Sequence, residues 1–157
     1  MALRKLDRGE TMVCLDTSGT GGLAPTWTPV GLTSVLRLDY GADAVVRDYP
    51  SRAAPVTYIA AYRPSVAQAL ALYEGDPAYD FVARHAFSLP LGGEAAVPAL
   101  VLFGGEGMRA WRADGCVVVP GMLDAARGRI TFLLELSGDI VCGRYAIEDG
   151  SPAFMET

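Results

Sequence analysis

Residues 58–87, YIAAYRPSVAQALALYEGDPAYDFVARHAF, decide the fold of this chain. They begin as an alternating apolar segment, pass through a Glu-Gly-Asp-Pro step and end as a short amphipathic segment. Asp76 can accept hydrogen bonds from free backbone amides, and Pro77 fits the first position of a helix. The pattern predicts one helix over about residues 77–86. Asp80 lies near the positive end of its dipole and His85 in its last turn.

Residues 64–73, just before this helix, allow two interpretations. The letters AQALALY have high helix propensity. The same residues alternate large side chains (Val66, Leu70, Leu72) with alanines, which is typical of a strand between a core and a close neighbour. Periodicity alone does not separate the two interpretations.

The rest of the chain predicts short strands separated by Gly, Pro and Asp turns. The cleanest alternation is over residues 129–136, where Ile130, Phe132, Leu134 and Leu136 share one face. A hairpin or a bulge is expected between segments 32–40 and 44–49, and hairpin turns at residues 104–107 and 137–139. The expected strands cover residues 11–16, 27–30, 32–40, 44–49, 56–61, 97–103, 108–120 (broken near Asp114-Gly115), 129–136, 140–147 and, as a last edge strand, 151–155.

Composition favours an assembled protein. The 157 residues suit one domain, residues 11–157, behind a polar arm of residues 1–10 that is either disordered or ordered against a neighbouring subunit. Hydrophobic residues make up 51% and charged residues 20%, so apolar surface is expected to be buried between subunits. A net charge of −5 argues against a nucleic-acid-binding face. We find no secretory signal or membrane-spanning run, which predicts a chain kept in the cytoplasm.

We expect no catalytic, cofactor-binding or metal-binding residues. His85 is the single histidine, and its place late in the helix favours a structural role beside the helix dipole. Cys14, Cys116 and Cys142 lack metal or disulfide spacing and lie in apolar segments. Asp76 and Asp80 are better explained as helix N-terminal charges than as an acid–base pair. The glycine-rich loop 17–25 reads as a connecting loop, because it lacks the Lys-Ser/Thr pair of a phosphate site.

The order of features resembles the phage tail tube family, including its relatives in tailocins and other contractile injection systems. The resemblance covers about residues 27–154. The matching pieces are Trp27-Thr-Pro-Val-Gly31, Tyr62-Arg-Pro-Ser65, Tyr73-Glu-Gly-Asp-Pro77 leading into Tyr79-Asp80-Phe81, Ser137-Gly-Asp-Ile140 and Gly143.

The resemblance implies a mainly β (α+β) fold in which two packed antiparallel sheets form a sandwich or barrel with one flanking helix. Residues 64–73 are then a strand. It also implies homo-hexameric rings that stack into a hollow conduit for phage DNA or an effector, without specific binding to the DNA. The implied partners are sheath, tape-measure, tail terminator and baseplate proteins, and the location is a virion assembled in the host cytoplasm. The alternative function is a non-enzymatic β-sandwich or barrel that binds a small apolar ligand or a protein.

Overall fold

A computed structural model describes residues 2–105, 107–136 and 139–157. The protein is mainly β, as the sequence predicts, and α1 is the one α-helix within these ranges. The elements are η1 (Arg8–Glu10), β1 (Met12–Asp16), β2 (Trp27–Pro29), β3 (Thr33–Asp39), β4 (Ala42–Arg47), β5 (Val56–Tyr62), β6 (Ser65–Ala71), α1 (Pro77–Phe87), η2 (Gly92–Ala95), β7 (Ala99–Leu102), β8 (Arg109–Ala113), β9 (Val117–Asp124), β10 (Arg129–Glu135), β11 (Ile140–Glu148) and β12 (Ser151–Glu156).

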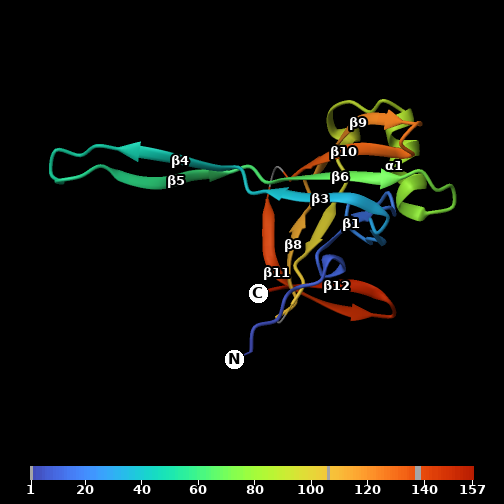
Figure 1. Cartoon of the computed structure of the whole chain (residues 1–157), viewed down its shortest axis with the longest axis horizontal. Helices are drawn as coiled ribbons and strands as arrows, with labels where there is room; N and C mark the ends of the chain where they lie inside the picture. The colour runs from blue at the N-terminus through green and yellow to red at the C-terminus, as the bar shows by residue number, and fades with distance from the viewer. Residues whose placement is uncertain (1, 106, 137–138) are drawn as a thin grey trace.

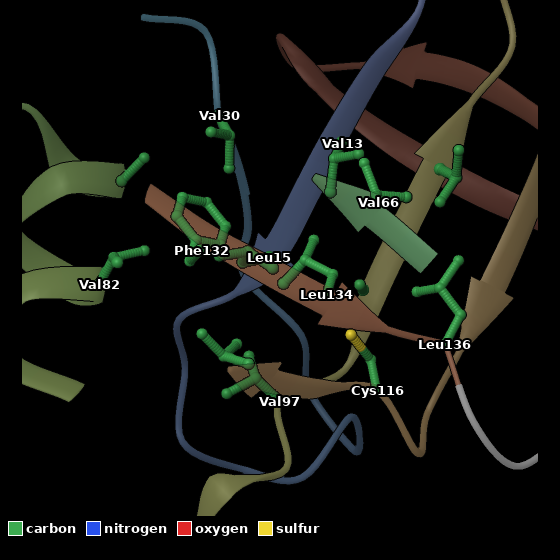
Figure 2. Close-up of a cluster of buried hydrophobic side chains, with 14 of the residues drawn as sticks. Val13, Leu15, Val30, Val66, Val82, Val97, Cys116, Phe132, Leu134 and Leu136 are labelled. Carbon is green, nitrogen blue, oxygen red and sulfur yellow. The ribbon is translucent and has the colours of Figure 1, made fainter. Parts of the chain in front are cut away.

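Two antiparallel sheets enclose the main core. One has the strand order β12-β11-β8-β7-β1-β2 and the other β3-β6-β10-β9. Figure 2 shows Val13 and Leu15 of β1 facing Phe132 and Leu134 of β10, and all four side chains are buried. The apolar parity of β10 therefore faces the opposite sheet, which confirms the expected alternation and the two packed sheets.

Strand β6 resolves the ambiguity of residues 64–73 in favour of a strand. It pairs with β3 on one side and β10 on the other, so its backbone groups are satisfied by neighbours distant in sequence. Val66 and Leu70 are buried in the core, while Ala67 and Ala71 lie on the opposite face. Gln68 shares the core parity, and both of its side-chain polar atoms are buried without a hydrogen-bond partner.

Helix α1 begins as the sequence predicts. The Asp76 carboxylate accepts a hydrogen bond from the Tyr79 amide at 3.3 Å, and the Asp80 carboxylate accepts one from the Gly75 amide. Val82, on the expected apolar stripe, is fully buried. Ala78 in the first turn is also buried. It lies four residues before Val82, so both side chains are on the same face of α1.

The strand expected over residues 108–120 breaks near Asp114-Gly115, as predicted, but its two parts, β8 and β9, do not lie in one sheet. The residues between them carry the chain from one sheet to the other. Cys116 is buried at this crossing, and its carbonyl accepts a hydrogen bond from the Val97 amide at 2.7 Å. β9 also continues to Asp124, through residues expected to be a connection. Whether the chain crosses between sheets here depends on contacts with residues that are distant in the sequence. A local sequence pattern therefore does not predict the crossing.

A hairpin between segments 32–40 and 44–49 is also wrong, although the alternative of a bulge is present at Asp43 and Ala44. β3 pairs with β6, and β4 pairs with β5. The turn at 104–107 does join two antiparallel strands, β7 and β8, with Glu106 outside the described residues. The expected turn at 137–139 includes Ser137 and Gly138, which also lie outside them. None of the helices described is long and apolar enough to span a membrane.

Candidate assembly surfaces

The single histidine, His85, lies against an aromatic ring of its own helix. His85 stacks on Phe81 in α1, with ring centroids 5.9 Å apart. Burial lowers its pKa, which favours the neutral imidazole. Within the described ranges, no three His, Cys, Asp or Glu side chains are grouped so that they could hold a metal ion.

The three cysteines are free. Burial raises the pKa of Cys14 to about 12, and burial together with the nearby Glu135 charge raises that of Cys116 to about 12. Both thiols therefore stay protonated at neutral pH, and a protonated thiol is a poor nucleophile. Cys142 is exposed on β11.

Asp16 organises the glycine-rich loop 17–25. One carboxylate oxygen accepts hydrogen bonds from the Ser18 amide, the Ser18 hydroxyl and the Thr26 amide, and the other accepts one from the Gly22 amide. Burial alone would raise the pKa of Asp16, but these hydrogen bonds outweigh it and hold the pKa below its ordinary value. The loop folds around a carboxylate of its own chain, which agrees with a connecting role.

Replacing Asp16 with asparagine is expected to destabilise the protein by about 1–3 kcal/mol at pH 7, because the amide group cannot accept all four hydrogen bonds. The pKa of Asp16 is depressed in the folded state, so its contribution is full above the ordinary value of 3.8 and is lost as the pH falls through the folded-state value. Urea unfolding at pH 7 and pH 3 should therefore show a smaller difference from wild type at pH 3. Asp48→Asn, at an exposed position, is the control and should change stability little at either pH.

The four-stranded sheet ends in β3 and β9, which pair within the chain on one side only over most of their length. An unpaired strand edge presents backbone donors and acceptors that readily join another strand. Val119, Met122 and Leu123 of β9 are also exposed, at 41%, 66% and 64%. Edge strands of soluble proteins are usually protected by charge, so an apolar exposed edge favours an interface.

The outer face of this sheet combines small side chains with larger ones such as Val35, Val119 and Leu133. Its central part carries Ala67, Ala69 and Thr131 around a hollow of about 340 Å³. The sequence led us to expect a close neighbour against the alanines of β6. Within one chain Ala67 and Ala69 line this hollow, so the close neighbour stays a prediction for the assembled protein.

Charges on the outer face are arranged in rows across the strands. Asp39 and Glu135 lie in one row, since both pair with Ser65. The next row contains Arg37 and Leu133, which both pair with Ala67. At the other end of the strands Arg129 pairs with Asp124. Acidic and basic side chains therefore both occur on this face, beside Ala67 and larger residues such as Leu133.

The β4–β5 hairpin projects from the body as an arm (Figure 1). Val46, Ile59 and Tyr62 are 64%, 49% and 58% exposed, and Arg47 donates a hydrogen bond to the Tyr58 hydroxyl at 2.7 Å. Its joint with the sheet is Gly41, which has φ +59° and lies so close to Arg63 that a Cβ atom would overlap the Arg63 carbonyl oxygen. A two-stranded ribbon with apolar side chains in water is marginally stable alone, so this arm is suited to contact another chain.

The chain shares its fold with chains in structures of contractile injection systems. A chain of the anti-feeding prophage baseplate, in a six-fold symmetrised structure, is 12% identical, with a TM-score of 0.50 over 92% of this chain and 98% of that one. A chain in the sheath/tube terminator structure of the extracellular contractile injection system PVC, in the extended state, is 10% identical. Its TM-score is 0.55 over 90% of this chain and 99% of that one.

A third similar chain belongs to the PVC sheath-tube complex in the extended state, at 10% identity and a TM-score of 0.49 over 89% of this chain and 92% of that one. No protein-family model and no curated protein matches the chain.

The projecting arm and the free edges were not singled out from the sequence. The sequence did contain one indication of the arm. Tyr49 lies before the turn at residues 50–55 and Tyr58 and Tyr62 lie after it, and such aromatic residues are unusual beside an exposed turn. The edges carried none, since which strand ends a sheet depends on pairings between residues far apart in the chain.

Proposed function

We propose that this protein is a structural, non-enzymatic subunit that forms hexameric rings, and that the rings stack into a hollow tube. Residues 11–157 act as one domain in this proposal, behind an arm of residues 1–10. The observation that carries it is the pair of free edges, β3 and β9, on opposite sides of one four-stranded sheet.

The strand directions allow these edges to join. All neighbours in the sheet are antiparallel, so β3 and β9, the first and fourth of four strands, run in opposite directions. When β9 of one copy meets β3 of the next, the new pair is also antiparallel and the sheet continues without a break. A head-to-tail interface of this kind closes into a ring when the rotation allows it, which leaves no edge of the four-stranded sheet exposed.

The expected ring is wide enough to be hollow. Four strands from each of six copies make a barrel of 24 strands. Barrel diameter grows with strand number, and barrels of about 16–18 strands already contain a water-filled channel. The six-fold symmetrised baseplate structure that contains a similar chain supports the choice of six copies.

The outer face of the four-stranded sheet, which carries the hollow of about 340 Å³, is the proposed channel wall. Small side chains such as Ala67 and Ala69 keep this wall smooth, and its charged rows contain both signs. A wall without a continuous basic stripe does not hold a phosphate backbone, so DNA or a protein effector can pass without being bound. The acidic net charge of the chain acts in the same direction.

Sheath, tape-measure, tail terminator and baseplate proteins are the further partners in this proposal. The folds shared with chains of injection-system baseplate and terminator structures support it, since these are particles built from such components. The proposed location is accordingly a phage tail or tail-like particle, assembled in the bacterial cytoplasm.

Negative-stain electron microscopy of the purified protein over a range of concentrations tests this function. We expect rings with six-fold symmetry and a central channel, together with stacks of rings at high concentration. A monodisperse monomer at high concentration would contradict the proposal if it also failed to assemble on added seeds, such as short fragments of tube. That result would favour the alternative, a β-sandwich that binds a small apolar ligand or a protein.

A further inference from the structure

A groove on the β3 side of the molecule opens into the main core. It has a volume of about 580 Å³. Val13 and Val101 of the six-stranded sheet and Val66 of the four-stranded sheet reach it from the core, and Leu36 and Leu38 of β3 are only partly buried beside it. Val13, Val66 and Val101 are themselves buried, so the apolar surface exposed in the groove is that of Leu36 and Leu38, and residues 6–9, 11 and 12 also line it.

An apolar loop lies on the other side of the same sheet. Phe87, Leu89 and Leu91 follow one another at alternate positions and are 88%, 79% and 83% exposed. The chain then forms η2, and Ala96 just after η2 forms an isolated β-bridge with Val117 of β9. Figure 1 shows this segment beside β9, while β3 forms the opposite edge of the sheet. We call residues 87–91 the apolar loop.

The backbone of the apolar loop is held in an unusual conformation. Leu89 has φ +49°, in the left-handed region that leucine rarely occupies. The Leu89 amide donates to the Ala86 carbonyl at 3.1 Å, and Pro90 follows directly. The large side chain of Leu89 is thus presented to solvent by a residue type poorly suited to that backbone, which argues that the side chain itself is needed.

We propose that the apolar loop of one copy inserts into the groove of the next copy in the ring. This inference rests on the proposed function, because it uses the junction between β9 and β3. When those edges join, the loop that flanks β9 of one copy faces the groove that flanks β3 of its neighbour. Each insertion removes exposed Phe and Leu side chains from water and covers the partly exposed Leu36 and Leu38 of the neighbour. The ring is then held by a second contact layer behind its continuous sheet.

The first test uses two variants, each of which blocks one side of the contact. Leu89→Asp removes the apolar side chain, and aspartate tolerates a positive φ better than leucine does. Gly31→Arg fills the groove mouth, where an added Cβ atom meets open space and φ is not positive. Leu23→Asp is the matched control, because Leu23 is 92% exposed in the loop 17–25.

Sedimentation velocity should show rings for wild type and for Leu23→Asp, and monomers for each blocking variant alone. An equimolar mixture of the two blocking variants should form dimers that stop at two chains, since it contains one intact loop paired with one intact groove. Unchanged thermal unfolding of each monomer verifies that the variants fold. Rings formed by Leu89→Asp as readily as by the control would overturn the inference and leave the proposed function standing.

A crosslinking experiment gives an independent answer in assembled rings. Leu89→Cys and Ser34→Cys are combined in a Cys142→Ser background, so that the introduced thiols are the exposed ones. Oxidation is expected to give disulfides between chains, seen as a ladder of up to six chains under denaturing conditions. Rings that yield no such ladder, or that yield only a disulfide within one chain, would contradict insertion. Failure of wild type to form rings at all would instead overturn the proposed function together with this inference.

Discussion

Phe132→Asp is expected to prevent folding of the protein. Phe132 is 3% exposed in the middle of β10, between its pairing partners Gln68 and Pro120. Removing a buried phenylalanine side chain alone costs about 3–5 kcal/mol, and an unpaired buried carboxylate adds several kcal/mol more. Domains of this size have about 5–15 kcal/mol of stability, so little or none would be left. Circular dichroism and electron microscopy should show loss of the folded chain and of rings.

Two further variants separate the effect of burial from that of charge. Phe132→Ala should fold with a stability lower by about 3–5 kcal/mol in urea unfolding. Thr131→Asp places the same carboxylate on the neighbouring residue of β10, whose side chain lies on the outer face of the sheet. This variant should fold and assemble. Soluble Phe132→Asp protein in complete tubes would show that Phe132 does not lie in the core.

Deleting the β4–β5 arm is expected to abolish stacking while leaving rings intact. Residues 42–62 can be replaced with Asn-Gly, a turn suited to joining Gly41 to Arg63, whose amide already donates to the Gly41 carbonyl at 3.0 Å. The arm has its own strand pairs and contributes no residue to the main core, so the body should keep its stability. Its exposed apolar side chains would no longer reach a neighbouring ring. The number of stacked rings seen by electron microscopy should fall below about a tenth of the wild-type number.

A point substitution at the joint provides the matched pair for this deletion. Gly41→Ala forces a Cβ atom against the Arg63 carbonyl and should redirect the arm, giving shorter stacks. Gly93→Ala adds the same methyl group in open space, at a residue that does not line the groove, and should stack normally. Full-length tubes from the arm-deleted protein would assign the ring-to-ring contact to another surface.

Local signals in the sequence were enough to predict those elements whose chemistry is local. Asp76 and Pro77 start α1 as expected, because capping involves residues within one turn. The alternation of apolar and polar residues in β10 is also a local signal, because a strand with one buried face shows it whatever the neighbouring strands are. Strand β6 was not predictable from its own letters. Its helix propensity is overruled by pairing with β3 and β10, whose residues lie far away in the chain.

The assembly surfaces depend on the same distant pairings. Asp114 and Gly115 marked a break in the sequence, but whether the chain turned back or changed sheets depended on where Cys116 could be buried. Gly41 likewise indicated an interruption between two strands. It did not indicate that the following residues leave the sheet and form the β4–β5 arm. Strands β3 and β9 are edge strands because of the strand order of the whole sheet, so the sequence of neither strand predicts its position at an edge.

In the proposed tube, the single projecting arm gives each subunit a direction along the tube axis. In a stack held by these arms, every ring presents arms on one side and receives them on the other. The two ends of such a polymer are chemically different, and subunits add to them at different rates. A protein that stops growth at one end therefore cannot serve the other, and the particle needs separate means to start the tube and to finish it.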